Sequence, residues 1–264
     1  MNQLNNPGCI EIDANDTMYI GDHHNYRVQM WTKGATTGVM IIDTTNADHP
    51  EALTFDKNGY LYLTGHYLQR VVRYPPDYSN FTIVAGVTNA GSSALNNLDD
   101  SLGIDLDNDL NLYIAERGNK RVMKWAPNAT SGTIVIGTGS TPRFYGLLLS
   151  LYSTNQAYVS SEEADAVYLW TFNAASPTVT LTQVNASTST LSEPRGIEYD
   201  TYGNLYVADT KNKRIVMYCP NSTLGRVAVA DSTLNLPQDV AFDSNLNMYV
   251  VDNSDSQVVR YNRL

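Results

Sequence analysis

Short apolar runs and polar turns recur along this chain with a period of about forty to fifty residues. Each repeat has a small apolar strand, an acidic turn, a second strand with a central tyrosine, a polar loop, and a third strand ending in an aromatic residue. The tyrosines are Tyr19, Tyr62, Tyr113, Tyr158, Tyr206 and Tyr249, and the closing aromatics are Trp31, Tyr74, Trp125, Trp170, Tyr218 and Tyr261. Both series have spacings of 43, 51, 45, 48 and 43 residues. Their strict periodicity predicts core positions in six copies of one unit.

The fifth repeat shows what one unit contains. Glu198 lies between Ile197 and Tyr199, the alternation of a strand, and a tight turn follows over Asp200–Gly203. Three more strands are predicted over 205–208, 215–218 and 227–230. A four-stranded repeat of this length is typical of radially arranged blades. The sequence therefore predicts an all-β, six-bladed β-propeller as a single domain over residues 1–264, essentially without helix.

The motifs of this repeat resemble those of a known family. They read Pro194-x-Gly196-Ile197-x-x-Asp200, then Gly203-x-Leu205-Tyr206-Val207-Ala208-Asp209-Thr210-x-Asn212-x-Arg214-Ile215. This pattern resembles the NHL repeat of six-bladed propellers (NHL/TolB-like), across essentially the whole chain. The fourth repeat departs from it, with Ser161 and Ala166 in place of the Asp and the Arg. The resemblance implies the fold and little about function, because such propellers serve as lyases, lactonases, receptor modules and RNA binders.

The sixth repeat contains only three predicted strands, near 238–243, 248–251 and 257–261. Its outer edge is formed by Val258, Val259, Arg260 and Tyr261. An unpaired edge is a template for strand addition, so a protein partner or a second copy is expected there. The alternatives are a solvated edge in a monomer and closure by residues 1–6 folding back.

Charge and composition exclude some partners. The net charge of −10 argues against nucleic acid and against anionic membrane surfaces, since both bind cationic proteins. No apolar run approaches the ~18 residues of a membrane span. Cys9 and Cys219, in the first and fifth repeats, are expected to be free.

Asn-x-Ser/Thr sequences suggest glycosylation, and with it an extracellular, secreted protein. They begin at Asn15, Asn80, Asn128, Asn185 and Asn221. All but Asn185 fall in turns on the bottom face of the expected propeller, which leaves the top face as the working face. Glycans are therefore predicted on Asn80, Asn128 and Asn221, and on Asn15.

Alternate repeats carry an acid and an arginine five residues apart. These pairs are Asp22/Arg27, Glu116/Arg121 and Asp209/Arg214, accompanied by Asn25, Asn119 and Asn212. We expect them to be structural ion pairs that brace a loop.

The same alternate repeats place a carboxylate in the first strand. Glu11, Asp105 and Glu198 are expected to face the central channel, and the fourth repeat offers Leu148 or Ser150 at that position. Three carboxylates around one axis could bind a hard cation such as Ca²⁺. The alternative is a water-filled acidic channel.

All four histidines belong to the first two repeats. His23, His49 and His66, with His24, are expected on the top face, where imidazoles could hold zinc or copper. Peptide-amidating lyases of this fold use histidines from three separate blades, and the later repeats here have none. Surface histidines in polar loops are the alternative.

These observations include no complete catalytic constellation. The function expected first is therefore a non-enzymatic extracellular binding or self-assembly module, with the longer top-face loops 86–100 and 185–193 as contact sites. The competing expectation is a metal-dependent lyase or hydrolase with its site in the central channel or on the top face.

Overall fold

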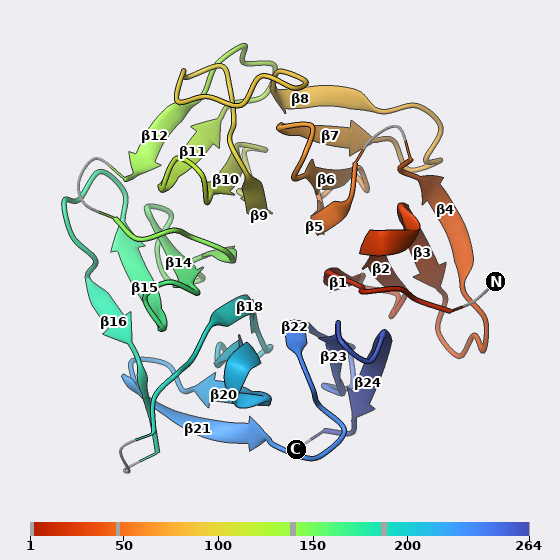
Figure 1. The fold of residues 1–264 in the computed structure, drawn as a ribbon, viewed down its shortest axis with the longest axis vertical. Helices are drawn as coiled ribbons and strands as arrows, with labels where there is room; N and C mark the ends of the chain where they lie inside the picture. Colours follow the sequence, from red (N-terminus) through yellow and green to blue (C-terminus); the bar gives the residue numbers. More distant parts are fainter. Residues whose placement is uncertain (1–2, 46–47, 138–140, 186–188, 264) are drawn as a thin grey trace.

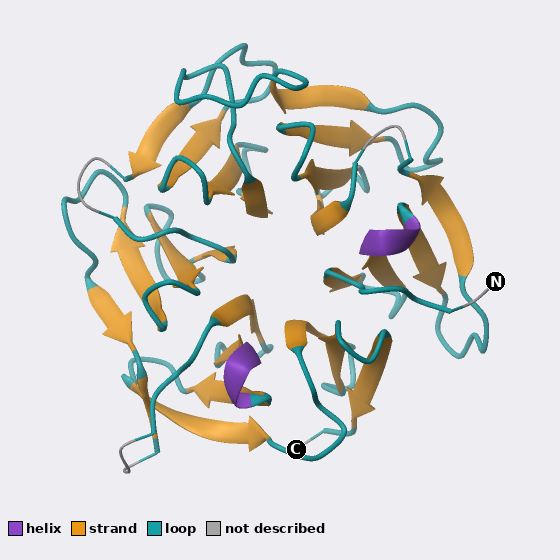
Figure 2. Cartoon of the chain, in the orientation of Figure 1, coloured by secondary structure: helices purple, strands orange, loops and turns teal. Residues whose placement is uncertain are grey.

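The computed structural model describes residues 3–45, 48–137, 141–185 and 189–263. They form six small sheets arranged in a ring, and the first strand of each sheet lies nearest the centre (Figures 1 and 2). Helix is limited to two short 3-10 turns, η1 (His23–Asn25) and η2 (Thr210–Asn212). The six-bladed β-propeller predicted from the repeat is confirmed. No helix in the described ranges is long and apolar enough to cross a membrane.

The first three blades each have four antiparallel strands in chain order. Blade one contains β1 (Cys9–Ile12), β2 (Met18–Asp22), β3 (Arg27–Trp31) and β4 (Val39–Asp43). Blade two contains β5 (Pro50–Phe55), β6 (Leu61–Gly65), β7 (Arg70–Tyr74) and β8 (Thr82–Gly86). Blade three contains β9 (Ser101–Leu106), β10 (Leu112–Glu116), β11 (Arg121–Trp125) and β12 (Thr133–Ile136).

The other three blades differ in strand number. Blade four contains β13 (Leu147–Leu149), β14 (Gln156–Ser161), β15 (Ala166–Thr171) and β16 (Val179–Leu181). Blade five contains β18 (Pro194–Tyr199), β19 (Leu205–Asp209), β20 (Arg214–Tyr218) and β21 (Leu224–Val229), and β17 (Gln183–Val184) adds a short parallel strand outside β21. Blade six contains only β22 (Pro237–Phe242), β23 (Met248–Asp252) and β24 (Gln257–Tyr261).

The outer side of β24 has no partner strand within the described part of the chain, as expected for an incomplete last blade. The N-terminal segment does not cover it. Instead, Arg27 donates to the Gln3 carbonyl at 2.9 Å and Asn5 N donates to Asp22 at 2.7 Å, so the segment lies over blade one. The alternative of edge closure by this segment is wrong for its described residues. Pairing of another chain with the edge at Val258–Tyr261 stays a prediction.

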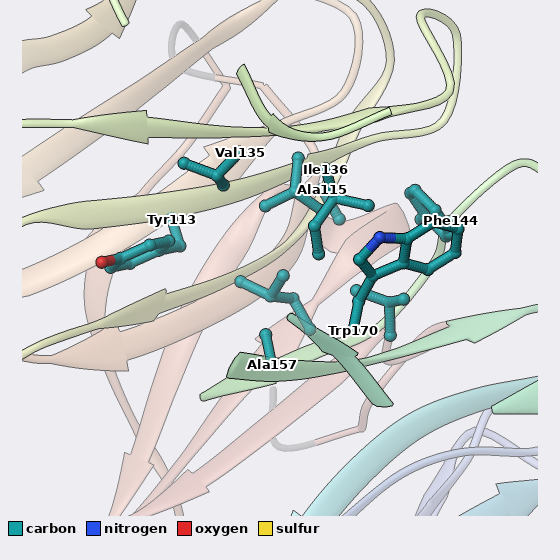
Figure 3. Close-up of a cluster of buried hydrophobic side chains, with 10 residues drawn as sticks. Tyr113, Ala115, Val135, Ile136, Phe144, Ala157 and Trp170 are labelled. Carbon is teal, nitrogen blue, oxygen red and sulfur yellow. The ribbon is translucent and has the colours of Figure 1, made fainter. Parts of the chain in front are cut away.

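Most of the repeated aromatics are buried in the core, as predicted, and the others are half-buried: Trp31, Tyr158, Tyr249 and Tyr261. Between blades three and four, Trp170 packs against Phe144, and the same buried cluster includes Tyr113, Ala115, Val135, Ile136 and Ala157 (Figure 3). Trp170 is 3% exposed, and its indole nitrogen donates to the Ala174 carbonyl at 3.0 Å. The polar end of the ring therefore has a partner while its body is buried, which is the usual state of a core tryptophan.

The repeated tyrosine and the repeated turn aspartate stabilise each other. In blade three, Asp107 accepts hydrogen bonds from Asp109 N and Asn111 N, and the Tyr113 hydroxyl donates to it at 3.2 Å. Blades one, two, five and six show the same tyrosine-to-aspartate bond. The aspartate closes the turn between the first two strands, and the tyrosine fixes that turn to the core. This explains why both residue types keep one spacing.

The acid-arginine pairs brace loops, as predicted. The Nε atoms of Arg27, Arg121 and Arg214 each lie 2.6 Å from the carboxylates of Asp22, Glu116 and Asp209. The same three carboxylates also accept backbone N–H groups from the segment leading into their own blade, donated by Asn5, Asp99 and Ser192. Each pair therefore fixes a connection between blades on the top face.

Candidate functional site

The first strands surround a central cavity of about 220 Å³. Glu11, Asp105 and Glu198 line it, each opposite the repeated tyrosine of its neighbouring strand, so they occupy one equivalent position as predicted. In blade four that position is Leu148, opposite Tyr158. Sequence reasoning missed a fourth carboxylate, Asp239, which stands in β22 where blades three to five have glycine.

Glycines allow this close approach of first strands. A Cβ at Gly103 would lie 2.6 Å from the backbone nitrogen of Leu147, and one at Gly196 would overlap the Asp239 carboxylate. Contacts this short are not found for real Cβ atoms, so larger residues would push the blades apart.

The channel carboxylates accept hydrogen bonds from backbone N–H groups, and those of Asp105 and Asp239 join neighbouring blades. Asp105 accepts from Leu149 N at 2.8 Å, and Asp239 accepts from Ile10 N at 3.0 Å. Glu198 accepts from Tyr199 N at 2.8 Å. Burial raises the pKa of Asp105 to about 6, of Asp239 to about 7 and of Glu198 to about 8. Burial, and then Glu198, raise the pKa of Glu11 well above its usual range.

The arrangement does not fit the calcium site expected from Glu11, Asp105 and Glu198. Among the described residues, no three His, Cys, Asp or Glu side chains are placed to hold one metal ion. The physical reason is that Asp105 and Glu198 direct carboxylate oxygens at backbone N–H groups instead of toward a common point.

A second cavity of about 230 Å³, the top basin, lies over the channel on the top face. The two cavities share Gly8, Glu51, Tyr145 and Gln238, so the channel opens into the basin.

The basin is built from equivalent positions of all six blades. One ring of residues precedes the channel position by three: Gly8, Glu51, Leu102, Tyr145, Arg195 and Gln238. A second set directly follows the second strand of a blade: His23, His66, Arg117 and Asn253. The repeat fixes the backbone at these positions, whereas the side chains differ from blade to blade. The basin is therefore lined by acidic, basic, amide and aromatic side chains.

One side of the basin holds a histidine and a carboxylate in contact. The Nε2 atom of His23 lies 2.8 Å from Glu51 Oε1, and both side chains are largely buried. An ionised carboxylate only accepts hydrogen bonds, so the Glu51 contact places the ring proton on Nε2 and leaves a lone pair on Nδ1. Glu51 therefore orients His23 and selects a tautomer that can take up a proton.

A linked set of charges also borders the basin. His66 Nδ1 lies 2.8 Å from Asp100 Oδ1, and Arg117 Nε lies 2.6 Å from Asp100 Oδ2. The hydrogen bond to Asp100 raises the pKa of His66. Arg117 Nη1 lies 3.8 Å from Glu162, a blade-four residue, in the same polar network.

The network continues through blade five. Arg195 Nε lies 2.5 Å from Glu162 Oε1, and Arg195 Nη1 donates to Gln238 Oε1 at 2.5 Å. The Tyr145 hydroxyl also donates to Gln238 Oε1, at 3.3 Å, while the Tyr145 ring lies 5.2 Å from the Arg195 guanidinium. Burial raises the pKa of Tyr145, so it keeps its proton and acts as a donor.

The histidines lie where the sequence placed them but do not converge on a metal. His23 contacts Glu51, His49 Nδ1 lies 3.0 Å from the His23 carbonyl, and His66 contacts Asp100. The rings of His23, His24 and His49 pack together, while His66 packs on Tyr67. Burial, and then His23, lower the pKa of His49. These residues do not fit the predicted zinc or copper site, because their ring nitrogens have separate partners.

Sequence reasoning did not identify five residues of the basin: Glu51, Arg117, Tyr145, Arg195 and Gln238. The sequence contained a signal that could have identified some of these residues. Glu51, Arg195 and Gln238 each follow a proline that begins a first strand, at a place in that motif where the repeats disagree. Positions that vary inside a strict repeat are not needed for the scaffold, and so are free to carry function.

No protein-family model matches the chain, and no curated protein matches it either. The NHL repeat is therefore not confirmed, while solved propellers are similar in fold. A catalytically inactive histidine-to-alanine variant of virginiamycin B lyase from Staphylococcus aureus, solved with quinupristin, has a TM-score of 0.68 at 12% identity, over 99% of this chain and 86% of that one.

Two further structures show the same likeness. A gluconolactonase from Xanthomonas campestris has a TM-score of 0.75 at 12% identity, over 96% of this chain and 84% of that one. A protein of unknown function from Bacteroides thetaiotaomicron has a TM-score of 0.76 at 15% identity, over 98% of this chain and 70% of that one. Likeness at this identity establishes the propeller fold.

These findings correct the function expected first. A non-enzymatic binding or self-assembly module was expected, yet the similar structures include lyases and gluconolactonases. That expectation rested on a search of the channel and the histidines for a complete site and did not consider the basin ring. The competing expectation of a lyase or hydrolase is the basis of the function proposed below.

Proposed function

We propose that this protein is an enzyme of the lyase or hydrolase class, and that the top basin is its active site. One observation carries the proposal. The oriented His23–Glu51 pair opens onto the same cavity as two arginines and a tyrosine. A base facing cationic and neutral donors is the arrangement needed when a proton leaves one atom and negative charge develops on another.

The proposed roles follow from the contacts. His23 Nδ1 takes a proton from substrate or water, and Glu51 stabilises the imidazolium that forms. Arg117 and Arg195 stabilise the negative charge that develops on a carbonyl or leaving oxygen. Tyr145 offers a hydroxyl proton on the channel side of the basin. No role is assigned to a metal.

The comparisons support this class of activity without defining a substrate. Proteins of the same fold are named as lyase and as gluconolactonase, and one lyase is inactive when a histidine is replaced. The motif resemblance is consistent with NHL-type repeats, and we propose that assignment for the scaffold.

Replacing His23 by alanine should abolish turnover while the fold is kept. Purified protein is incubated with gluconolactone and with quinupristin, and the products are separated and weighed by mass spectrometry. Hydrolysis adds one water to the substrate, whereas a lyase breaks a bond with no gain in total mass. Loss of a general base should lower kcat/KM by roughly 10²–10⁴.

His24→Ala is the matched control, because His24 lines the same basin and has no carboxylate partner among the described residues. It should retain most of the activity. Equal losses in the two variants would contradict the assignment of His23. Absence of turnover with every cyclic ester and depsipeptide tested would overturn the proposed function.

We also propose that the protein is secreted and carries glycans on Asn80, Asn128 and Asn221, and on Asn15. All four residues are exposed in turns between strands, and Asn128 and Asn221 have φ angles of 60° and 61°. Material secreted by a eukaryotic cell should exceed the polypeptide mass, and the excess should fall stepwise when each Asn is changed to Gln. A sample with the bare polypeptide mass would contradict the proposal.

A further inference from the structure

Two arginines from different blades face each other across one acid at the rim of the basin. Arg117 follows β10 of blade three, Arg195 lies in β18 of blade five, and Glu162 follows β14 of blade four between them. Glu162 lies 2.5 Å from Arg195 Nε and 3.8 Å from Arg117 Nη1. The acid therefore holds both guanidinium groups on the same side of the cavity.

Each guanidinium keeps N–H donors that make no hydrogen bond within the described part of the chain. Arg195 Nη2 makes no hydrogen bond with a described residue, while Nε and Nη1 are engaged by Glu162 and Gln238. Arg117 Nη1 reaches Glu162 only at 3.8 Å, which is too long for a hydrogen bond. Both arginines line the basin, so these N–H groups are available to a bound ligand.

The charges of the two arginines are partly balanced by carboxylates of the protein itself. Arg117 and Arg195 contact Asp100 and Glu162, and His66 also contacts Asp100. His23 and Glu51 form a further contact pair in the same basin. A bound anion would therefore use the N–H groups that these carboxylates leave free.

We propose that Arg117 and Arg195 form a carboxylate-binding subsite, and that the ligand of the top basin is a small hydroxy acid or a substrate that yields one. Arg117 Nη1 and Arg195 Nη2 can each donate to one oxygen of a carboxylate, because the other nitrogens of both guanidinium groups already contact Asp100, Glu162 and Gln238. Asn6 and Asn253 line the same cavity and supply amide partners for hydroxyl groups. This inference rests on the proposed function, because the same basin is assigned as the active site.

The test is direct binding, which does not depend on turnover. Gluconate, its neutral amide gluconamide, and inorganic phosphate are titrated into the full chain by calorimetry. We expect gluconate to bind at least about ten-fold more tightly than gluconamide, since a charge-assisted bidentate contact is lost in the amide. Arg117→Gln and Arg195→Gln should each raise the gluconate Kd by about ten-fold or more.

Three controls accompany the binding measurements on the arginine variants. Arg226→Gln, at an exposed position of the outer strand β21, should leave the Kd unchanged. Arg195→Lys keeps the positive charge but lacks the several N–H donors of a guanidinium group, so it should bind gluconate more tightly than Arg195→Gln and more weakly than wild type. Thermal melts of all variants establish that the fold is retained.

Equal binding of gluconate and gluconamide, no binding of either, or arginine variants with wild-type affinity would each overturn the proposal. Tighter binding of phosphate would also overturn it, by assigning the subsite to a different anion. His23→Ala separates the two hypotheses, because it should remove turnover and retain gluconate binding. Turnover that fails while binding passes the arginine test would refute the enzyme and leave the subsite standing.

Discussion

Replacing Arg121 by methionine should lower the free energy of unfolding by about 3–5 kcal/mol, the range for breaking one partner of a buried ion pair. Arg121 is 4% exposed and Glu116 is fully buried, with Nε and Oε1 2.6 Å apart. The substitution leaves the Glu116 carboxylate without its cation. Burial already raises the pKa of Glu116, so an unpaired charge there costs more still.

The same arginine also holds the loop 86–100. Its Nη1 donates to the Ser93 carbonyl at 2.7 Å, and its Nη2 donates to the carbonyls of Ala94 and Asn97 at 3.2 Å each. Hydrogen exchange should therefore show that amides in this loop lose protection in Arg121→Met before the rest of blade three does. The loop was expected to be a contact surface, and the structure shows how it is fixed.

Urea unfolding measures the loss, and two variants control it. Arg226→Met, on an exposed strand, should change stability by less than about 0.5 kcal/mol. The double variant Glu116→Leu with Arg121→Met removes both charges and should recover part of the loss. A single Arg121→Met variant within about 1 kcal/mol of wild type would show that the pair does not hold the blade together.

The scaffold could be predicted from the sequence because the same stabilising contacts recur from blade to blade. Asp107 closes a turn and Tyr113 fixes that turn to the core, and the same two roles recur in four other blades. A residue spacing that recurs in the sequence therefore indicates a contact that recurs in the structure. The acid-arginine pairs were predicted for the same reason, since both partners lie within one short loop.

The basin could not be predicted in this way. Arg117, Glu162 and Arg195 meet across three blades, and no local pattern connects residues this far apart in the chain. Glu51 orients His23 from the next blade. The scaffold residues are visible because they agree between repeats, whereas these residues differ from blade to blade. Only the closed ring shows which of them share a cavity.

The channel illustrates a half-correct prediction. The position shared by Glu11, Asp105 and Glu198 was right, because strand alternation fixes which face a side chain occupies. Their expected convergence on a cation was not supported, because it depends on side-chain direction, and Asp105 bonds a neighbouring strand instead. Asp239 was missed because the repeat has a small residue there.

Stability should fall as pH rises from about 5 to 9, and the channel carboxylates should be the cause. Burial raises the pKa of Glu198 to about 8 and that of Asp239 to about 7. In the unfolded chain such groups titrate near 4. Between these values the folded state holds more protons than the unfolded state, so raising the pH favours unfolding. The stabilisation is complete below the unfolded pKa and is lost as pH passes the folded pKa.

Glu198→Gln should reduce this slope, because the amide keeps the shape of the protonated acid and cannot ionise, while Asp239 still titrates. Glu198 is only half-buried, and solvent therefore screens part of its charge, so we expect a change on the order of 2 kcal/mol at pH 9, or roughly 4–8 °C in Tm for a domain of this size. Melting curves of both proteins across the pH range measure it. Asp77→Asn, at an exposed turn where hydrogen bonds from Ser79 lower the pKa of the carboxylate, should keep the wild-type slope between pH 5 and 9. Equal changes of stability with pH in wild type and Glu198→Gln would mean that Glu198 is already ionised at neutral pH. The channel would then again be a candidate site for a bound cation.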